Sequence, residues 1–165
     1  MEKVTAKSKG TLARRLAWSL PALVLMSGLA LAPVGAAQAG GAIATQTVKG
    51  KFNKVIASLK REIARHKLVI IKQIPYRKML AMVGTKSEPL MGFEIFHPRF
   101  GKVIYGADVN AFKEVPLRIL LRGTKSGVVI QYRKPSAIFA SYPGLAGLGK
   151  QLDGAFADIV KRLAK

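Results

Sequence analysis

Hydrophobic positions follow a helical period in two long segments of the chain. Over residues 52–66 the apolar side chains recur every three or four positions, which predicts an amphipathic helix. These apolar positions are Phe52, Val55, Ile56, Leu59 and Ile63. The same spacing predicts a helix over residues 148–163, with an apolar face made of Leu148, Leu152, Phe156, Ile159, Val160 and Leu163.

Shorter apolar runs between these helices predict strands. They are rich in β-branched residues and are bounded by Pro or Gly, which favours strands over helices. The runs cover residues 68–74, 91–97, 117–122 and 128–132, with 45–48 as a candidate first strand. The run at 68–74 is almost entirely apolar, so we expect a buried strand.

The links between the strands complete the prediction. Residues 123–127 are expected to join the last two strands as a hairpin with a longer loop. Short helices are expected at 76–83, 100–107 and 135–141. This order predicts an α+β fold, a compact single domain with a single sheet of about four or five strands packed with helices.

The first 39 residues have a different pattern, with a basic start, an apolar middle and an Ala-Gln-Ala end. These are the three parts of a secretory signal peptide. We therefore expect a cleaved signal peptide over 1–39, a flexible start over 40–47 and the folded domain over 48–165. The alternative is an uncleaved inner-membrane anchor, because the apolar run 16–32 is close to the roughly 18 residues that cross a bilayer. Both place the domain in the periplasm.

Charge narrows the classes of partner. Five of the 28 basic residues and one of the eight acids lie in the leader, which leaves the domain with a net charge of about +16. A surface this basic attracts anions, although net charge can also serve solubility alone. Export argues against nucleic acid, so the expected partners are an anionic lipid or an acidic envelope partner.

Residues able to carry chemistry are sparse. The domain has no Cys and only two His, His66 and His97, without metal-ligand spacing, so no metal and no cofactor is expected. His97 alone remains an alternative axial ligand for non-covalent haem. Residues 144–150 match the phosphate-loop pattern Gly-x-x-x-x-Gly-Lys, but Gln151 replaces the Ser or Thr of that motif, and we expect a turn into the last helix. No nucleophile–base pair is recognisable, which favours binding over catalysis.

Two basic surfaces are the candidate binding sites. The first is the turn after the strand 91–97, formed by His97, Arg99 and Lys102. A helix start there presents free backbone N–H groups, and adjacent cations add to its attraction for anions. The second is the basic face of the first helix, formed by Lys54, Arg61 and Arg65. A solvated helix face is the alternative interpretation of that stripe.

Three segments carry a family resemblance. Gly92-Phe-Glu-Ile-Phe-His-Pro-Arg-Phe-Gly101 resembles the strand-turn-helix signature of the bacterial family called domain of unknown function 302. Val115-Pro-Leu-Arg-Ile-Leu120 is similar to that family's Leu-Pro-Leu strand, and Gly127-Val-Val-Ile-Gln-Tyr132 to its hairpin return. The likeness covers residues 48–165. It implies a compact α+β domain, often exported and often a homodimer, and it implies no particular reaction.

The chain departs from the family pattern at two places. Pro75-Tyr76-Arg77 stands where many members carry a His, and Phe96-His97-Pro98 replaces a common Phe-Gly-Asn-Pro. With these departures, we expect an exported, homodimeric binding module for an anionic ligand or envelope partner. The alternative is a haem or small-ligand carrier, or an enzyme, centred on His97.

Overall fold

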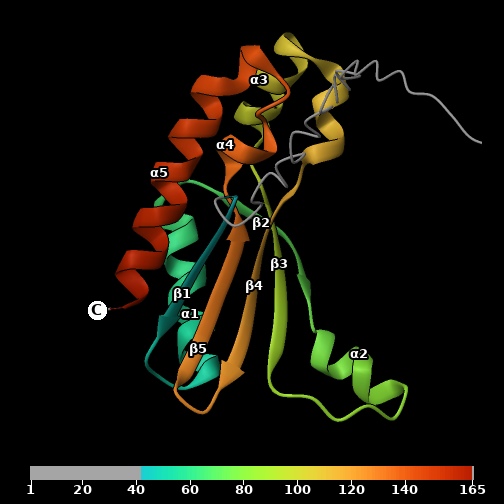
Figure 1. Ribbon diagram of the computed structural model, residues 1–165, viewed down its shortest axis with the longest axis vertical. Helices are drawn as coiled ribbons and strands as arrows, with labels where there is room; N and C mark the ends of the chain where they lie inside the picture. The colour runs from blue at the N-terminus through green and yellow to red at the C-terminus, as the bar shows by residue number, and fades with distance from the viewer. Residues whose placement is uncertain (1–41, 165) are drawn as a thin grey trace, which may run out of the picture. The chain divides into compact units, whose positions relative to one another are not determined.

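Figure 1 shows the computed structural model, which describes residues 42–164. The leader expected at 1–39 lies outside the described residues. The strands are β1 (Ile43–Val48), β2 (Val69–Ile74), β3 (Leu90–Phe96), β4 (Leu117–Thr124) and β5 (Gly127–Arg133). The helices are α1 (Phe52–Arg65), α2 (Tyr76–Met82), α3 (Pro98–Ala107), α4 (Pro135–Ile138) and α5 (Ala146–Leu163), with 3-10 turns η2 (Val109–Glu114) and η3 (Pro143–Leu145). Within residues 42–164, no helix has both the length and the apolar character needed to span a bilayer.

All five strands form one antiparallel sheet in the order β1-β5-β4-β3-β2. This confirms the predicted α+β fold. The candidate strand at 45–48 is confirmed within β1, which begins at Ile43, so residues 43–47 of the expected flexible start are part of a strand instead. They are held there because β1 pairs with β5 along its whole length, from Ile43 opposite Arg133 to Val48 opposite Val128.

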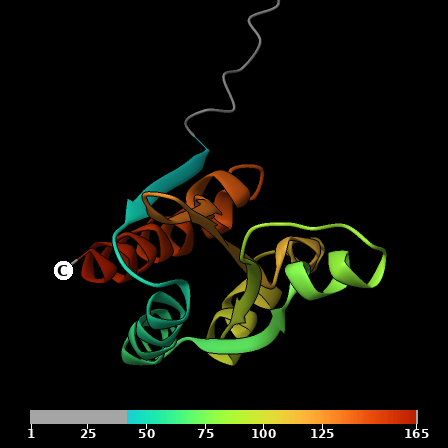
Figure 2. The same cartoon turned by 90° about the horizontal axis from the view of Figure 1, so that it is seen from below.

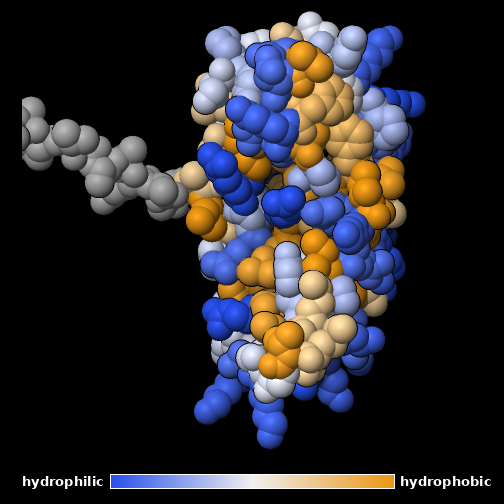
Figure 3. Space-filling view, turned by 90° about the vertical axis from the view of Figure 1, so that its right-hand side faces the viewer, coloured by the Kyte–Doolittle hydropathy of each residue, from blue (hydrophilic) through white to orange (hydrophobic). Residues whose placement is uncertain are grey.

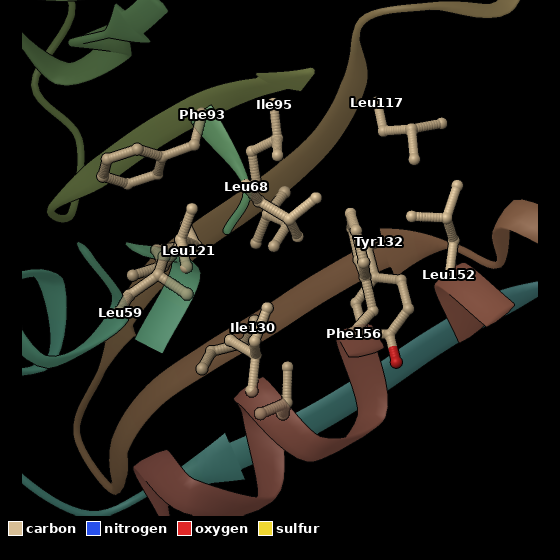
Figure 4. Close-up of a cluster of buried hydrophobic side chains, with 14 of the residues drawn as sticks. Leu59, Leu68, Phe93, Ile95, Leu117, Leu121, Ile130, Tyr132, Leu152 and Phe156 are labelled. Carbon is tan, nitrogen blue, oxygen red and sulfur yellow. The ribbon is translucent and has the colours of Figure 1, made fainter. Parts of the chain in front are cut away.

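One face of the sheet carries the hydrophobic core. The apolar faces predicted for the two long helices are confirmed, since α1 buries Val55, Leu59 and Ile63 and α5 buries Leu148, Leu152, Phe156, Ile159 and Val160. These side chains meet the sheet residues Phe93, Ile95, Leu117, Leu121, Ile130 and Tyr132 (Figure 4). The Tyr132 and Phe156 rings pack at 5.2 Å between centroids. Burial of these groups is the main source of stability for the domain.

Two local predictions are wrong. The run at 68–74 was expected to be a buried strand, but β2 lies at the sheet edge and exposes Val69 and Ile71. An apolar run in the sequence indicates that a strand can be buried. It does not show whether a helix covers that strand in the folded domain. The hairpin was expected to have a longer loop, but only Lys125 and Ser126 separate β4 from β5.

The glycines of the phosphate-loop pattern serve helix packing. Gly149 lies inside α5, and a Cβ there would come within 2.8 Å of the Ser136 Cα on α4. Close approach also lets the Asp153 carboxylate of α5 accept a hydrogen bond of 2.9 Å from the Ser136 backbone N–H. This segment thus holds α4 against α5, and it begins the helix two residues earlier than predicted.

A small ionic cluster links the end of α1 to α5. His66 Nε2 lies 3.0 Å from Asp158 Oδ2, and Arg162 Nε donates to the same oxygen at 2.7 Å. Arg162 Nε is also 3.9 Å from Glu62 Oε2 on α1. The hydrogen bond from Arg162, and then the contact with His66, holds the pKa of Asp158 below its ordinary value.

A lowered carboxyl pKa means that ionised Asp158 favours the folded chain. Its contribution is present above the ordinary pKa of about 4 and is lost as pH falls through the lower folded value. Asp158→Asn is therefore expected to lower the melting temperature at pH 7. The difference from wild type should shrink below about pH 4, as followed by circular dichroism. Equal melting curves at pH 7 would contradict the role given to Asp158.

Candidate functional site

The first predicted site lies at the start of α3. His97 is the N-cap residue of α3, and its Nδ1 accepts a hydrogen bond of 3.0 Å from the Arg99 backbone N–H. Its ring contacts Phe100 edge-on at 5.6 Å between centroids. Arg99 and Lys102 are exposed nearby on α3. The three residues thus share one turn, as predicted.

The imidazole of His97 is half-buried and packs on Phe100. One His97 nitrogen already serves the helix start. These observations favour a structural role for the imidazole and give no support to haem at this position.

The second predicted site is exposed on α1, and two of its cations are engaged within that helix. Arg61 donates to Ser58 Oγ at 2.9 Å, and Arg65 pairs with Glu62 at 3.4 Å. Lys54 is exposed about two turns before Arg61. Such i, i+3 contacts on an exposed helix are typical of a solvated face.

The sheet face opposite α1 and α5 holds a hollow that the sequence did not reveal. On β4, Arg118 and Leu120 alternate with the buried Leu117, Ile119 and Leu121, so they point to this other face. The hollow has a volume of about 380 Å³. Its lining is mostly apolar and is formed by Ile43, Ile74, Tyr76, Gly92, Phe93, Arg118, Ile119, Leu120, Gln131, Tyr132 and Arg133. We call it the outer-face hollow.

Tyr76 forms one wall of the outer-face hollow because Gly92 leaves space for its ring. A Cβ on Gly92 would come within 2.7 Å of Tyr76 Cε2. The ring of the first α2 residue therefore lies directly on the β3 backbone. This contact fixes where α2 leaves the sheet.

Two arginines line the outer-face hollow on neighbouring strands. Ile119 lies opposite Tyr132, and the same register continued by one position places Arg118 opposite Arg133. Arg118 Nε donates to Glu94 Oε1 at 3.2 Å, with Glu94 only 17% exposed. Among residues 42–164, Arg133 has no carboxylate within ion-pair distance. Like charges opposite each other destabilise a strand pair, so this arrangement favours an anion between the strands.

A smaller hollow of about 250 Å³ adjoins the first and shares Arg118 and Arg133 with it. Lys113 lines it too, and its contact with Tyr142, followed by the charge of Glu114, raises the Lys113 pKa above its usual value. Burial, and then the charge of Asp153, raises the pKa of the Tyr132 phenol. The smaller hollow therefore presents the Lys113 cation at neutral pH, whereas the neutral Tyr132 phenol belongs to the core side of the sheet, where its ring packs on Phe156. In the described part of the chain, no three His, Asp or Glu residues are grouped to hold a metal ion.

Sequence reasoning missed the outer-face hollow because its residues come from six separate strands or helices. A usable signal existed at the hairpin. A two-residue link would have placed Arg118 opposite Arg133, but the longer loop that we expected removes this pairing. The alternation of charged and apolar residues on β4 was the second signal.

Gly92→Ala is expected to push the Tyr76 ring off the sheet. Overpacking of this kind costs about 1–3 kcal/mol, measured as a lower free energy of unfolding in urea. The near-ultraviolet circular dichroism of tyrosine should also change. The control is Gly147→Ala, since a Cβ there meets nothing within 4 Å. Full wild-type stability of Gly92→Ala would contradict the close contact.

Comparison with known proteins places this fold in a family. The family model described as "Domain of unknown function DUF302" matches residues 44–164. No curated protein is significantly similar to this chain. Among solved structures, the chain resembles the "uncharacterized conserved protein DUF302 from Bacillus stearothermophilus", with 17% identity, a TM-score of 0.68 and coverage of 74% of this chain and 98% of that one. That likeness shows the shared fold, and the match over residues 44–164 confirms the resemblance found in the sequence. The chain belongs to the DUF302 family.

Proposed function

We propose that this chain is an exported binding domain that takes a small anion with an apolar body into the outer-face hollow. The observation that carries the proposal is the pair Arg118 and Arg133 on an apolar hollow, with only Arg118 paired to a carboxylate. A charge-assisted, two-pronged contact is what an arginine offers to a carboxylate or a phosphate.

The shape and lining of the hollow support the second half of the proposal. Its volume of about 380 Å³ lies within the usual range for small-molecule sites. Ile43, Ile74 and Leu120 provide an apolar lining, and the Tyr76 ring provides a wall. An apolar tail would displace water from this surface, while the anionic end pairs with Arg133.

The lining residues support binding more than catalysis. They include no His, Ser, Cys or carboxylate that could serve as a nucleophile or as a general base at neutral pH. Gln131 and Tyr76 supply hydrogen-bonding groups that can orient a ligand. The proposed role is therefore that of a carrier or sensor.

The proposed periplasmic location depends on the signal peptide predicted at 1–39. The homodimer stays a prediction from the family resemblance. Export predicts that material recovered from the periplasm begins at Gly40. Mass spectrometry of the intact native protein measures this directly. Protein retaining Met1 and recovered from the cytosol would contradict export.

Octanoate and 1-octanol provide a matched pair of probes for the hollow. Every described core residue lies between Val48 and Val160, so protein beginning at Gly40 keeps the full core and suits the titrations. Arg133→Gln is expected to weaken octanoate binding about tenfold or more, because a hydrogen bond to a charged group is lost. Binding of 1-octanol should change little. Isothermal titration calorimetry measures both.

Arg65→Gln is the control, since it removes the same charge from the opposite side of the sheet, on α1. It should bind octanoate like the wild type. Equal octanoate affinity of the Arg133→Gln variant and the wild type would contradict the proposal. An equal loss of octanoate binding in both variants would assign the effect to net charge and would also contradict it.

A further inference from the structure

Helix α2 stands out because none of its residues is buried. It projects from the sheet away from α1 and α5 (Figure 2). Met79 is 51% exposed, Met82 85% and the following Val83 76%. Large apolar side chains grouped and exposed in this way usually mark a surface that another body covers.

The apolar residues of α2 lie on one side of the helix. Met79, Met82 and Val83 have i, i+3 and i+4 spacing, so they are neighbours on the helix surface. Tyr76, the first residue of the helix, packs on Gly92 of the sheet. The helix therefore faces the sheet with one side and presents methionine and valine outward.

The segment that carries these apolar residues is also basic. From Pro75 to Ser87 the chain contains Arg77, Lys78 and Lys86 and no acid. None of the three forms an ion pair within residues 42–164. Figure 3, which faces the side of the molecule where α2 projects, shows hydrophobic patches bordered by hydrophilic side chains. Residues 76–86 are hereafter the α2 arm.

We propose that the α2 arm docks the domain onto an anionic lipid surface. Met79, Met82 and Val83 enter the boundary between head groups and acyl chains, and Arg77, Lys78 and Lys86 contact lipid phosphates. Short amphipathic segments bind membranes by this combination of apolar insertion and attraction to anionic lipids. Each cation near such a surface strengthens binding about fivefold.

Charge favours a lipid surface over a second copy of the chain. In a two-fold contact between two arms, the same patch would face itself. Arg77 and Lys78 would then lie near their counterparts without any acid from either arm, and like charges at an interface disfavour association. An anionic bilayer offers acyl chains for the apolar residues and phosphates for the cations at the same surface.

This inference goes beyond the proposed function, since Tyr76 is the only residue that the arm shares with the outer-face hollow. The two proposals can therefore fail separately. Vesicle binding tests the arm, and octanoate binding by the same variants tests the hollow.

The experiment measures flotation of the protein beginning at Gly40 with vesicles of phosphatidylcholine containing 30% phosphatidylglycerol, in about 0.1 M salt. The double variant Met82→Ser, Val83→Ser is expected to bind at least tenfold more weakly. The double variant Arg77→Gln, Lys78→Gln is expected to bind about 25-fold more weakly. Pure phosphatidylcholine vesicles should bind the wild type poorly.

The control double variant Arg61→Gln, Lys125→Gln removes the same charge from two other exposed positions. It should bind the anionic vesicles within twofold of the wild type. An equal loss in the control would assign binding to net charge and overturn the proposal. Wild-type vesicle binding by the Met82→Ser, Val83→Ser variant would overturn it as well.

A direct readout of insertion uses the absence of Cys from the sequence. A single Met82→Cys variant, labelled with the environment-sensitive dye NBD, should shift to shorter emission wavelength with anionic vesicles, and a labelled Lys125→Cys variant should not. No shift at position 82 would overturn the insertion. A dimer by light scattering that the Met82→Ser, Val83→Ser variant abolishes would assign the arm to a protein interface and overturn the proposal.

Discussion

The packing of α1 and α5 on the same face of the sheet is the constraint on which the rest of this structure depends. Both helices bury their apolar sides against alternate residues of β3, β4 and β5. Because both long helices pack on one face, neither of them covers the other face, and only the short α2 leaves the sheet away from them (Figures 1 and 2). The open face is therefore where polar and apolar groups can meet a ligand.

The open face explains why two arginines can lie opposite each other on adjacent strands. In the core, their desolvation would be prohibitive. On the outer face, water screens Arg133, while Glu94 pairs with Arg118. The same openness lets Tyr76 lie on Gly92 and leaves α2 projecting from the sheet edge. One asymmetry of packing thus produces both the hollow and the exposed arm.

A candidate site could be predicted from the sequence only where its residues are close together along the chain. The turn formed by His97, Arg99 and Lys102 is contiguous, and its grouping was visible without coordinates. The outer-face hollow joins Tyr76, Gly92 and the Arg118–Arg133 pair, which are distant in sequence. Their proximity depends on strand order and on a two-residue hairpin, and a longer expected loop was enough to conceal it.

The sequence by itself determined the two amphipathic helices, most of the strands, the α+β class and the family, because periodicity and short motifs are local properties. It could not determine that β2 is an exposed edge strand or that β1 pairs with β5. An apolar run in the sequence does not show which element covers it in the fold. Strand order depends on which pairings together bury the most surface. Only the tertiary structure decided which face stayed open, since that choice follows from where both long helices pack.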